Sequence, residues 1–329
     1  MIKNLIWLVG ILFLYSCNTT NDKNMNKSNP LMCDPQTGVC EIPDKNTQES
    51  SILKSQVSDN RVKVLYFTDP ICSACWAIEP QLKKLRLEYG NLFTIEYCMG
   101  GLLPSWVNYN GGGIQNPADV AHHWDEISDY YHMPIDGNVW LEDPLSSSYP
   151  PSIAFKAAEM QDKEAAALFM RVMREMLFLE KKNIAKWENI SMAAQRAGLD
   201  SERLKYDYDN GAQQLFEKDL ETSRQSGVRG FPTLVFYNEN EQQTVVYGVK
   251  SYEAYEQAIL KLYPLAVKQV YSKDELTLIT YFGSLTVKEL LVLSDITISE
   301  AEKKLRKLAE EGRAVEIQSR KGSLWRLKK

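Results

Sequence analysis

Two cysteines separated by two residues are the group in this sequence best suited to chemistry. They lie in Cys72-Ser73-Ala74-Cys75, directly after an apolar, strand-like run and at the start of a helix-like run. A helix N-terminus carries unpaired N–H groups and a partial positive charge, which favour a thiolate over a thiol. We expect Cys72, the more exposed sulfur, to attack a client sulfur, and Cys75, one turn along, to resolve the mixed disulfide. This chemistry needs no organic cofactor.

The same pair is open to two other interpretations. It is half of a zinc site if two further ligands reach it, and Cys33 and Cys40 are the other close pair of cysteines. The pair could also be a purely structural disulfide. This is less favoured, because structural disulfides join distant elements, whereas both of these cysteines lie at the start of one helix. The chain has only three histidines, so there is little material for a His-based metal site, and we expect no metal.

Cys33 and Cys40 enclose a Pro-x-x-Gly turn, a spacing at which a disulfide can close. Three hypotheses remain for this pair: a local staple, a second redox pair that exchanges with Cys72 and Cys75, and metal binding. We expect Cys98, the remaining cysteine of the globular part, to be a small buried hydrophobe at a strand end.

The elements that must position the cysteines follow the order β-α-β, a helical block, then β-β-α. This order predicts an α/β protein with a thioredoxin core over 59–112 and 226–268 and a helical insertion over 113–225. Hydrophobic runs with turn signals at their ends predict strands at 62–67, 92–99, 233–237 and 244–247. Helical periodicity and caps predict helices at 76–89, 152–161, 163–180, 184–197, 201–224 and 251–263.

The segment 270–329 is expected to be a separate, winged-helix-like unit. Two helices, at 286–293 and 299–311, precede a hairpin at 313–317 and 323–327. From Lys273 on, twelve Lys and Arg stand against nine Asp and Glu, which is too weak a charge to favour DNA. The whole chain has a net charge of −5, so we expect no nucleic-acid partner.

The first 17 residues resemble a bacterial lipoprotein signal. A short basic start and an apolar run end in Leu14-Tyr15-Ser16-Cys17, and residues 18–58 then read as a polar tether that carries the Cys33/Cys40 loop. Lipid at Cys17 would anchor the protein to a membrane in the cell envelope, facing the periplasm or the exterior. The alternatives are a buried apolar N-terminal helix, or translation from Met25 or Met32, which would make the protein cytoplasmic.

The paired motifs around the cysteines resemble the DsbA-like family, and within it the FrnE-like branch, which includes cytoplasmic adaptors for ClpXP proteolysis. The resemblance covers about residues 60 to 268. The motifs that carry it are Asp69-Pro70-Ile71-Cys72-Ser73-Ala74-Cys75-Trp76, Gly100-Gly101-Leu102, Ser146-Ser147-Ser148 leading into Pro150-Pro151 and Lys156-Ala157-Ala158, and Gly227-Val228-Arg229-Gly230-Phe231-Pro232-Thr233.

The resemblance implies roles for the residues around the second motif. Pro232 would be a cis-proline opposite the cysteines, and Phe231 and Gly230 would pair with an extended client segment, beside Trp76. The implied partners are client proteins with thiols or disulfides and a redox partner that recycles the pair. The adaptor branch implies an alternative, a non-catalytic cytoplasmic adaptor that presents a protein to a protease.

The sequence departs from the strong oxidases of this family at two positions. The dipeptide between the cysteines is Ser-Ala, whereas the archetypal oxidase has a histidine that holds the thiolate, so Cys72 is expected to be less acidic. Position 66, where many thioredoxin-fold enzymes bury a carboxylate, is Tyr66. Five aromatic residues of the insertion are either core or a client-binding wall: Trp124, Tyr130, Tyr131, Trp140 and Tyr149. The histidines His122, His123 and His132 are expected to be structural.

Overall fold

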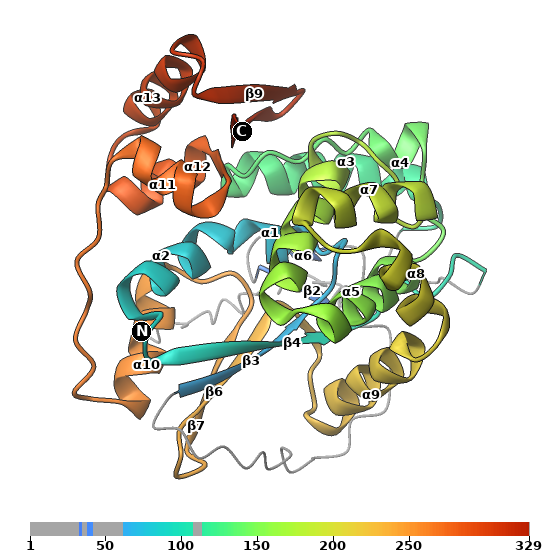
Figure 1. Cartoon of the computed structure of the whole chain (residues 1–329). Helices are drawn as coiled ribbons and strands as arrows, with labels where there is room; N and C mark the ends of the chain where they lie inside the picture. The colour runs from blue at the N-terminus through green and yellow to red at the C-terminus, as the bar shows by residue number, and fades with distance from the viewer. Residues whose placement is uncertain (1–32, 35–37, 42–61, 108–113, 329) are drawn as a thin grey trace, which may run out of the picture.

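A four-stranded sheet forms the centre of the computed structural model, which describes residues 33–34, 38–41, 62–107 and 114–328 (Figure 1). The strand order is β4(Phe93–Met99)-β3(Val62–Thr68)-β6(Thr233–Tyr237)-β7(Gln243–Tyr247). β3 pairs with β4 in parallel, while β6 is antiparallel to both β3 and β7. The four predicted strands are confirmed to within two residues, because each is a short β-branched or aromatic run bounded by turn residues.

The helix that follows the cysteines is broken, whereas the sequence pattern predicted one helix over 76–89. α1(Ser73–Ala77) ends at Ile78, whose N–H donates to the carbonyl of Trp76 in a tighter turn, and α2(Glu79–Tyr89) begins directly after it. Pro80, in the first turn of α2, has no N–H to continue the α1 ladder. α10(Tyr252–Leu262) packs against α2 and extends over β6 and β7.

The insertion between β4 and β5(Gly230–Phe231) is helical, as predicted. The predicted helix over 201–224 is two helices, because Asn210 and Gly211 break it; Gly211 has a φ of +141°, which few residues other than glycine adopt. The helices of the insertion are α3(Pro117–Tyr131), α4(Val139–Glu142), α5(Tyr149–Gln161), α6(Lys163–Phe178), α7(Trp187–Ala197), α8(Ser201–Asp209) and α9(Ala212–Gln225).

A second, small sheet joins the N-terminal segment to the core. β1(Cys33–Asp34) pairs with β2(Val39–Glu41), and β2 pairs antiparallel with β5. The carbonyl of Gly38 accepts a hydrogen bond of 2.9 Å from the N–H of Val249. Within the described part of the tether, the loop around Cys40 is therefore packed on the core, and the expectation that it hangs on a flexible tether is wrong for this segment.

The C-terminal unit has a core of its own and the element order of a winged helix. The sequence missed its first helix, which is rich in threonine, isoleucine and aromatic residues that favour strands, and its first strand, which has only three residues. Its elements are α11(Glu275–Phe282), β8(Ser284–Thr286), α12(Val287–Ser294), α13(Ile298–Glu310), β9(Ala314–Ser319) and β10(Gly322–Leu327), with the strands in the order β8-β10-β9. In Figure 1 the unit (orange to red) lies beside α2 and α3.

Buried ion pairs hold this unit against the thioredoxin part. Glu289 of α12 is fully buried and accepts two hydrogen bonds from Arg171 of α6, of 2.7 and 3.0 Å. Lys83 of α2 lies 2.9 Å from the same carboxylate, and Arg171 also donates to Glu175 at 2.8 Å. One buried charged cluster therefore connects two helices of the thioredoxin part to α12.

Candidate redox site

The loop between β3 and α1 presents Cys72 at the start of the helix, as the sequence predicted. Cys72 is the N-cap residue of α1, and its Sγ accepts a hydrogen bond of 3.1 Å from the N–H of Cys75. The two cysteines form a disulfide with a Cα–Cα distance of 5.2 Å, within the range that closes without backbone movement. The same N–H can hold a Cys72 thiolate once the disulfide is reduced.

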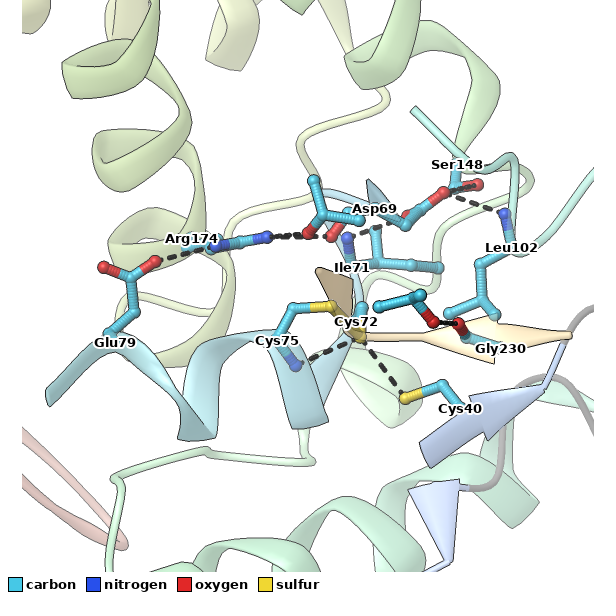
Figure 2. The surroundings of a disulfide bond; sticks show 12 residues. Cys40, Asp69, Ile71, Cys72, Cys75, Glu79, Leu102, Ser148, Arg174 and Gly230 are labelled. Atoms are coloured by element: carbon cyan, nitrogen blue, oxygen red, sulfur yellow. Dashed lines mark hydrogen bonds and ion pairs between the residues drawn. A yellow bond between two sulfur atoms is a disulfide. The ribbon is translucent and has the colours of Figure 1, made fainter. Parts of the chain in front are cut away.

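Cys72 and Cys75 are equally buried, so the expectation that Cys72 is the more exposed of the two is wrong. Cys72 and Cys75 are each 0% exposed. Strand β2 of the N-terminal hairpin lies over the site and places Cys40, also 0% exposed, beside Cys72. Figure 2 shows the three sulfurs together; the Sγ atoms of Cys40 and Cys72 are 3.4 Å apart.

The peptide bond between Phe231 and Pro232 is cis, as the resemblance implies. β5, which ends at this bond, pairs with β2 in the register Cys40↔Phe231 and Glu41↔Gly230. Two hydrogen bonds shape the turn: Thr233 Oγ1 donates to the Gly230 carbonyl at 2.7 Å, and the N–H of Gly248 donates to the Pro232 carbonyl at 2.8 Å. The backbone edge at Gly230 and Phe231 therefore accepts an extended strand directly beside Cys72.

Gly100 is needed where β4 ends against the cis-proline loop. The ring of Phe231 occupies the space that a side chain at position 100 would need, because a Cβ here would come within 1.6 Å of the ring. Glycine is the residue that permits so close an approach. Gly100, the first residue of the pair that ends the predicted strand, thus also leaves room for the Phe231 ring.

Trp76, expected to contact clients, is buried and faces the insertion. Its indole N–H donates to the carbonyl of Pro134 at 3.1 Å, its ring packs beside Phe178, and the Arg171 guanidinium lies 4.4 Å from the ring centre. It joins α1 to the helical insertion and presents no surface to a client here, since its exposure is 0%.

Asp69 is a buried carboxylate whose role the sequence did not indicate beyond ending the strand. It accepts hydrogen bonds from the N–H of Ile71 at 3.0 Å, the N–H of Leu102 at 2.8 Å and the hydroxyl of Ser148 at 3.0 Å (Figure 2). Burial raises the pKa of Asp69 to about 6. One side chain thus ties the Cys72 loop to the segment after β4 and to the start of α5.

Arg174 of α6 fixes the same strand end from the other side. It donates to Thr68 Oγ1 at 2.7 Å and to the backbone carbonyl of Asp69 at 3.2 Å, and pairs with Glu79 at 2.8 Å. Arg174 lies on a helix and Asp69 in a loop more than 100 residues earlier, so no periodic pattern in the sequence relates them. Only a homologue alignment could have singled them out.

Tyr66 occupies the position where many enzymes of this fold bury a carboxylate. It is 1% exposed, and burial raises its pKa to about 12. The phenol therefore holds its proton at neutral pH and does not act as a base for Cys75.

The remaining predictions concern packing. Cys98 is buried at the end of β4, as predicted, and donates to the carbonyl of Asp219 at 3.3 Å. Trp124 and Trp140 are core residues in edge-to-face contact, with ring centres 5.2 Å apart. Tyr130 is exposed, whereas the hydroxyl of Tyr131 lies against Gly38 of the hairpin.

The part of the chain that the structure describes has neither a cluster of metal ligands nor a membrane-spanning helix. There, no three His, Cys, Asp or Glu side chains gather in a way that could hold a metal ion. Among the helices of residues 33–34, 38–41, 62–107 and 114–328, none combines the length and apolar character that a membrane span requires. Cys17 and the predicted signal lie outside these residues.

Comparison with known proteins gives one family and a consistent set of relatives. Residues 65–257 match a family model described as thioredoxin. The chain is 36% identical over 311 residues to the ClpXP adapter protein SpxH of Halalkalibacterium halodurans, covering 91% of this chain and 97% of the relative. It is 31% identical over 270 residues to the protein of the same name from Bacillus subtilis, covering 80% and 89%.

Among solved structures, a candidate protein disulfide isomerase from Nitrosomonas europaea superposes with a TM-score of 0.54. Its sequence identity is 20%, and the match covers 61% of this chain and 97% of that chain. At this identity the likeness concerns the fold alone.

Proposed function

The chain belongs to the thioredoxin family, and from that premise we propose that it is a thiol–disulfide oxidoreductase acting on protein thiols through Cys72 and Cys75. The observation that carries the proposal is the placement of a dithiol beside a backbone edge that accepts a strand, at Gly230 and Phe231. Extended peptides bind such edges through main-chain hydrogen bonds. Its clients are proteins with thiols or disulfides, and a separate redox protein recycles the pair.

Each residue of the centre has a role in this chemistry. Cys72 attacks or is attacked by the client sulfur, Cys75 resolves the mixed disulfide, and Pro232 ends the client-pairing edge without offering an N–H. The N–H of Cys75 and the start of α1 favour the Cys72 thiolate. No organic cofactor or metal takes part, because the electrons pass between sulfur atoms.

The test is exchange with a reduced or oxidised client protein, using the purified chain and matched serine variants. Cys72→Ser should abolish exchange, and Cys75→Ser should accumulate a mixed disulfide between Cys72 and the client. Cys98→Ser is the control, since Cys98 is buried away from the dithiol and should leave the rate unchanged. Retained exchange in Cys72→Ser would rule out the proposed function.

A second candidate function is that of a ClpXP adapter. Two relatives, aligned over 97% and 89% of their own length at 36% and 31% identity, carry this name. We expect this function of a cytoplasmic chain only. The measurement is degradation of a bound protein by purified ClpXP with and without the chain. An adapter should accelerate degradation, and the Cys72→Ser/Cys75→Ser double variant should retain that effect.

We propose export and a lipid anchor at Cys17 for the oxidoreductase, on the strength of the residues before it. The two functions therefore predict different N-termini. Mass spectrometry of the protein from its own cells decides: a diacylated Cys17 supports the exported oxidoreductase. A chain that begins at Met25 or Met32 supports the adapter.

A further inference from the structure

The N-terminal hairpin occupies the edge at which a client strand would bind. β2 pairs antiparallel with β5, and Cys40 sits directly opposite Phe231, the residue before the cis-proline. Gly38, two residues before Cys40, accepts a hydrogen bond of 2.9 Å from the N–H of Val249 and lies against the Tyr131 hydroxyl. The chain thus presents its own cysteine to Cys72 in the geometry expected of a client.

The sulfur of Cys40 is placed for exchange with Cys72. The two Sγ atoms are 3.4 Å apart, a contact distance, and both residues are fully buried. Cys40 is itself disulfide-bonded, while Cys72 is bonded to Cys75. Neither sulfur therefore carries a proton, and the contact is one between two disulfides.

The hairpin register identifies the partner of Cys40. Cys33 pairs with Cys40 across β1 and β2, and residues directly opposite in an antiparallel ladder have the Cα separation that a disulfide needs. Cys98 is free and lies with Asp219 and Ser223, and Cys72 and Cys75 bond to each other. Cys33 is therefore the cysteine that the backbone offers to Cys40.

We propose that Cys33 and Cys40 form a second redox pair that exchanges its disulfide with Cys72 and Cys75 inside the molecule. The inference rests on the proposed function, which it deepens by giving the dithiol an internal electron partner. When Cys72 and Cys75 are reduced, the Cys72 thiolate attacks Cys40 Sγ; the Cys40–Cys72 bond forms, the Cys33–Cys40 bond breaks, and Cys33 leaves as a thiolate.

The second step completes the transfer. The Cys75 thiolate attacks Cys72 Sγ, the Cys72–Cys75 bond forms, and Cys40 leaves as a thiolate. Two electrons have passed from the Cys72/Cys75 dithiol to the hairpin, and the two protons lost by the first pair are taken up by Cys33 and Cys40. The reverse sequence carries electrons from the hairpin to the dithiol.

The experiment traps the intermediate in the full-length chain. Cys33→Ser/Cys75→Ser removes both resolving sulfurs, so the reduced protein, on mild oxidation, should form the Cys40–Cys72 bond, read by peptide mapping without reductant. Linked sulfurs have an effective concentration in the millimolar range, so at about 10 µM chain the bond should form about 100-fold faster than any bond between molecules. Its rate should not change on tenfold dilution.

The matched control is Cys33→Ser/Cys72→Ser, which leaves Cys40 with Cys75 and should give little intramolecular bond. Circular dichroism establishes that both variants are folded, and Cys33→Ala/Cys75→Ala repeats the trap if serine disturbs the site. A folded trap variant that pairs Cys40 no faster than the control overturns the relay. Client exchange by the unmutated chain is measured separately. If clients are exchanged but no Cys40–Cys72 bond is trapped, the relay alone is rejected. If clients are not exchanged, the proposed function is rejected.

Discussion

At the scale of single residues, the buried carboxylate of Asp69 holds the Cys72 loop in place, but burying its charge destabilises the folded state. Its two carboxylate oxygens accept three hydrogen bonds from segments that meet around the Cys72 loop. Burial nevertheless raises its pKa from 3.8 to about 6, so the folded protein binds this proton more tightly than the unfolded chain. The protonated carboxyl of Asp69 therefore stabilises the folded state at low pH, and this stabilisation is lost as the pH rises through about 6.

Asp69→Asn should reveal this titration. A difference of about two pKa units corresponds to about 3 kcal/mol, so the stability of the unmutated chain relative to Asp69→Asn should fall by up to that amount between pH 4 and pH 7. The measurement is urea unfolding of both proteins at each pH. A stability difference that does not vary over this range would contradict the raised pKa.

Cys98 is expected to be chemically inert in the folded protein. Burial raises the pKa of its thiol, and the thiolate is the reactive form. Iodoacetamide applied to the reduced, folded chain should leave Cys98 unmodified, while unfolding in urea should expose it to complete reaction. Mass mapping of the cysteine peptides is the measurement, and rapid labelling of Cys98 before unfolding would refute the expectation.

At the scale of elements, the hairpin β1–β2 is a lid over the dithiol, and Gly38 holds it in place. Its φ of +68° and its contact with Val249 leave no room for a side chain, because a Cβ would come within 2.5 Å of the Val249 Cβ. A residue with a side chain at this position must move the hairpin or strain its turn.

Gly38→Ala should therefore loosen the lid and make Cys72 more reactive. After reduction, alkylation of Cys72 in Gly38→Ala should be at least several-fold faster than in the unmutated chain, measured by quenched labelling and mass spectrometry. Gly198→Ala is the matched control: Gly198 has a similar φ of +79°, but nothing lies within 4 Å of its Cβ position. Equal rates in all three proteins would mean that the hairpin does not shield Cys72.

At the scale of the whole molecule, the C-terminal unit is docked through buried charges. Burial alone would raise the pKa of Glu289, but Arg171 and Lys83 outweigh it and lower the pKa to about 2. A depressed pKa means that this carboxylate stabilises the fold above its unfolded pKa of 4.5, and that the contribution is lost as the pH falls from about 4.5 towards 2.

Glu289→Gln should leave Arg171 and Lys83 buried without their shared partner. Removing one member of a buried pair costs about 3 to 5 kcal/mol, so the free energy of unfolding at pH 7 should fall by that amount. Urea unfolding is the measurement. Glu311→Gln, which removes an exposed pairing with Lys307 on α13, is the control and should change stability little. A loss in Glu289→Gln no greater than in this control would show that the cluster does not hold the unit.

The sequence by itself determined the four strands of the central sheet, most of the longer helices and the reacting pair. Strands such as β3 and β6 are hydrophobic runs between turn residues, and the spacing of Cys72 and Cys75 at a helix start is local, so both can be read without a fold. The helix breaks at Ile78 and Gly211 were missed, because a periodic hydrophobic pattern continues across a single break in the backbone.

The tertiary structure alone decided what surrounds that pair. Cys40 lies 32 residues before Cys72 and Arg171 lies 118 before Glu289, and no periodicity relates residues so far apart. The burial of Cys72, the packing of Trp76 and the raised pKa of Asp69 all follow from which segments cover them. Burial and charge pairing depend on the three-dimensional neighbours of a residue, whereas helix and strand formation depend on its neighbours along the chain.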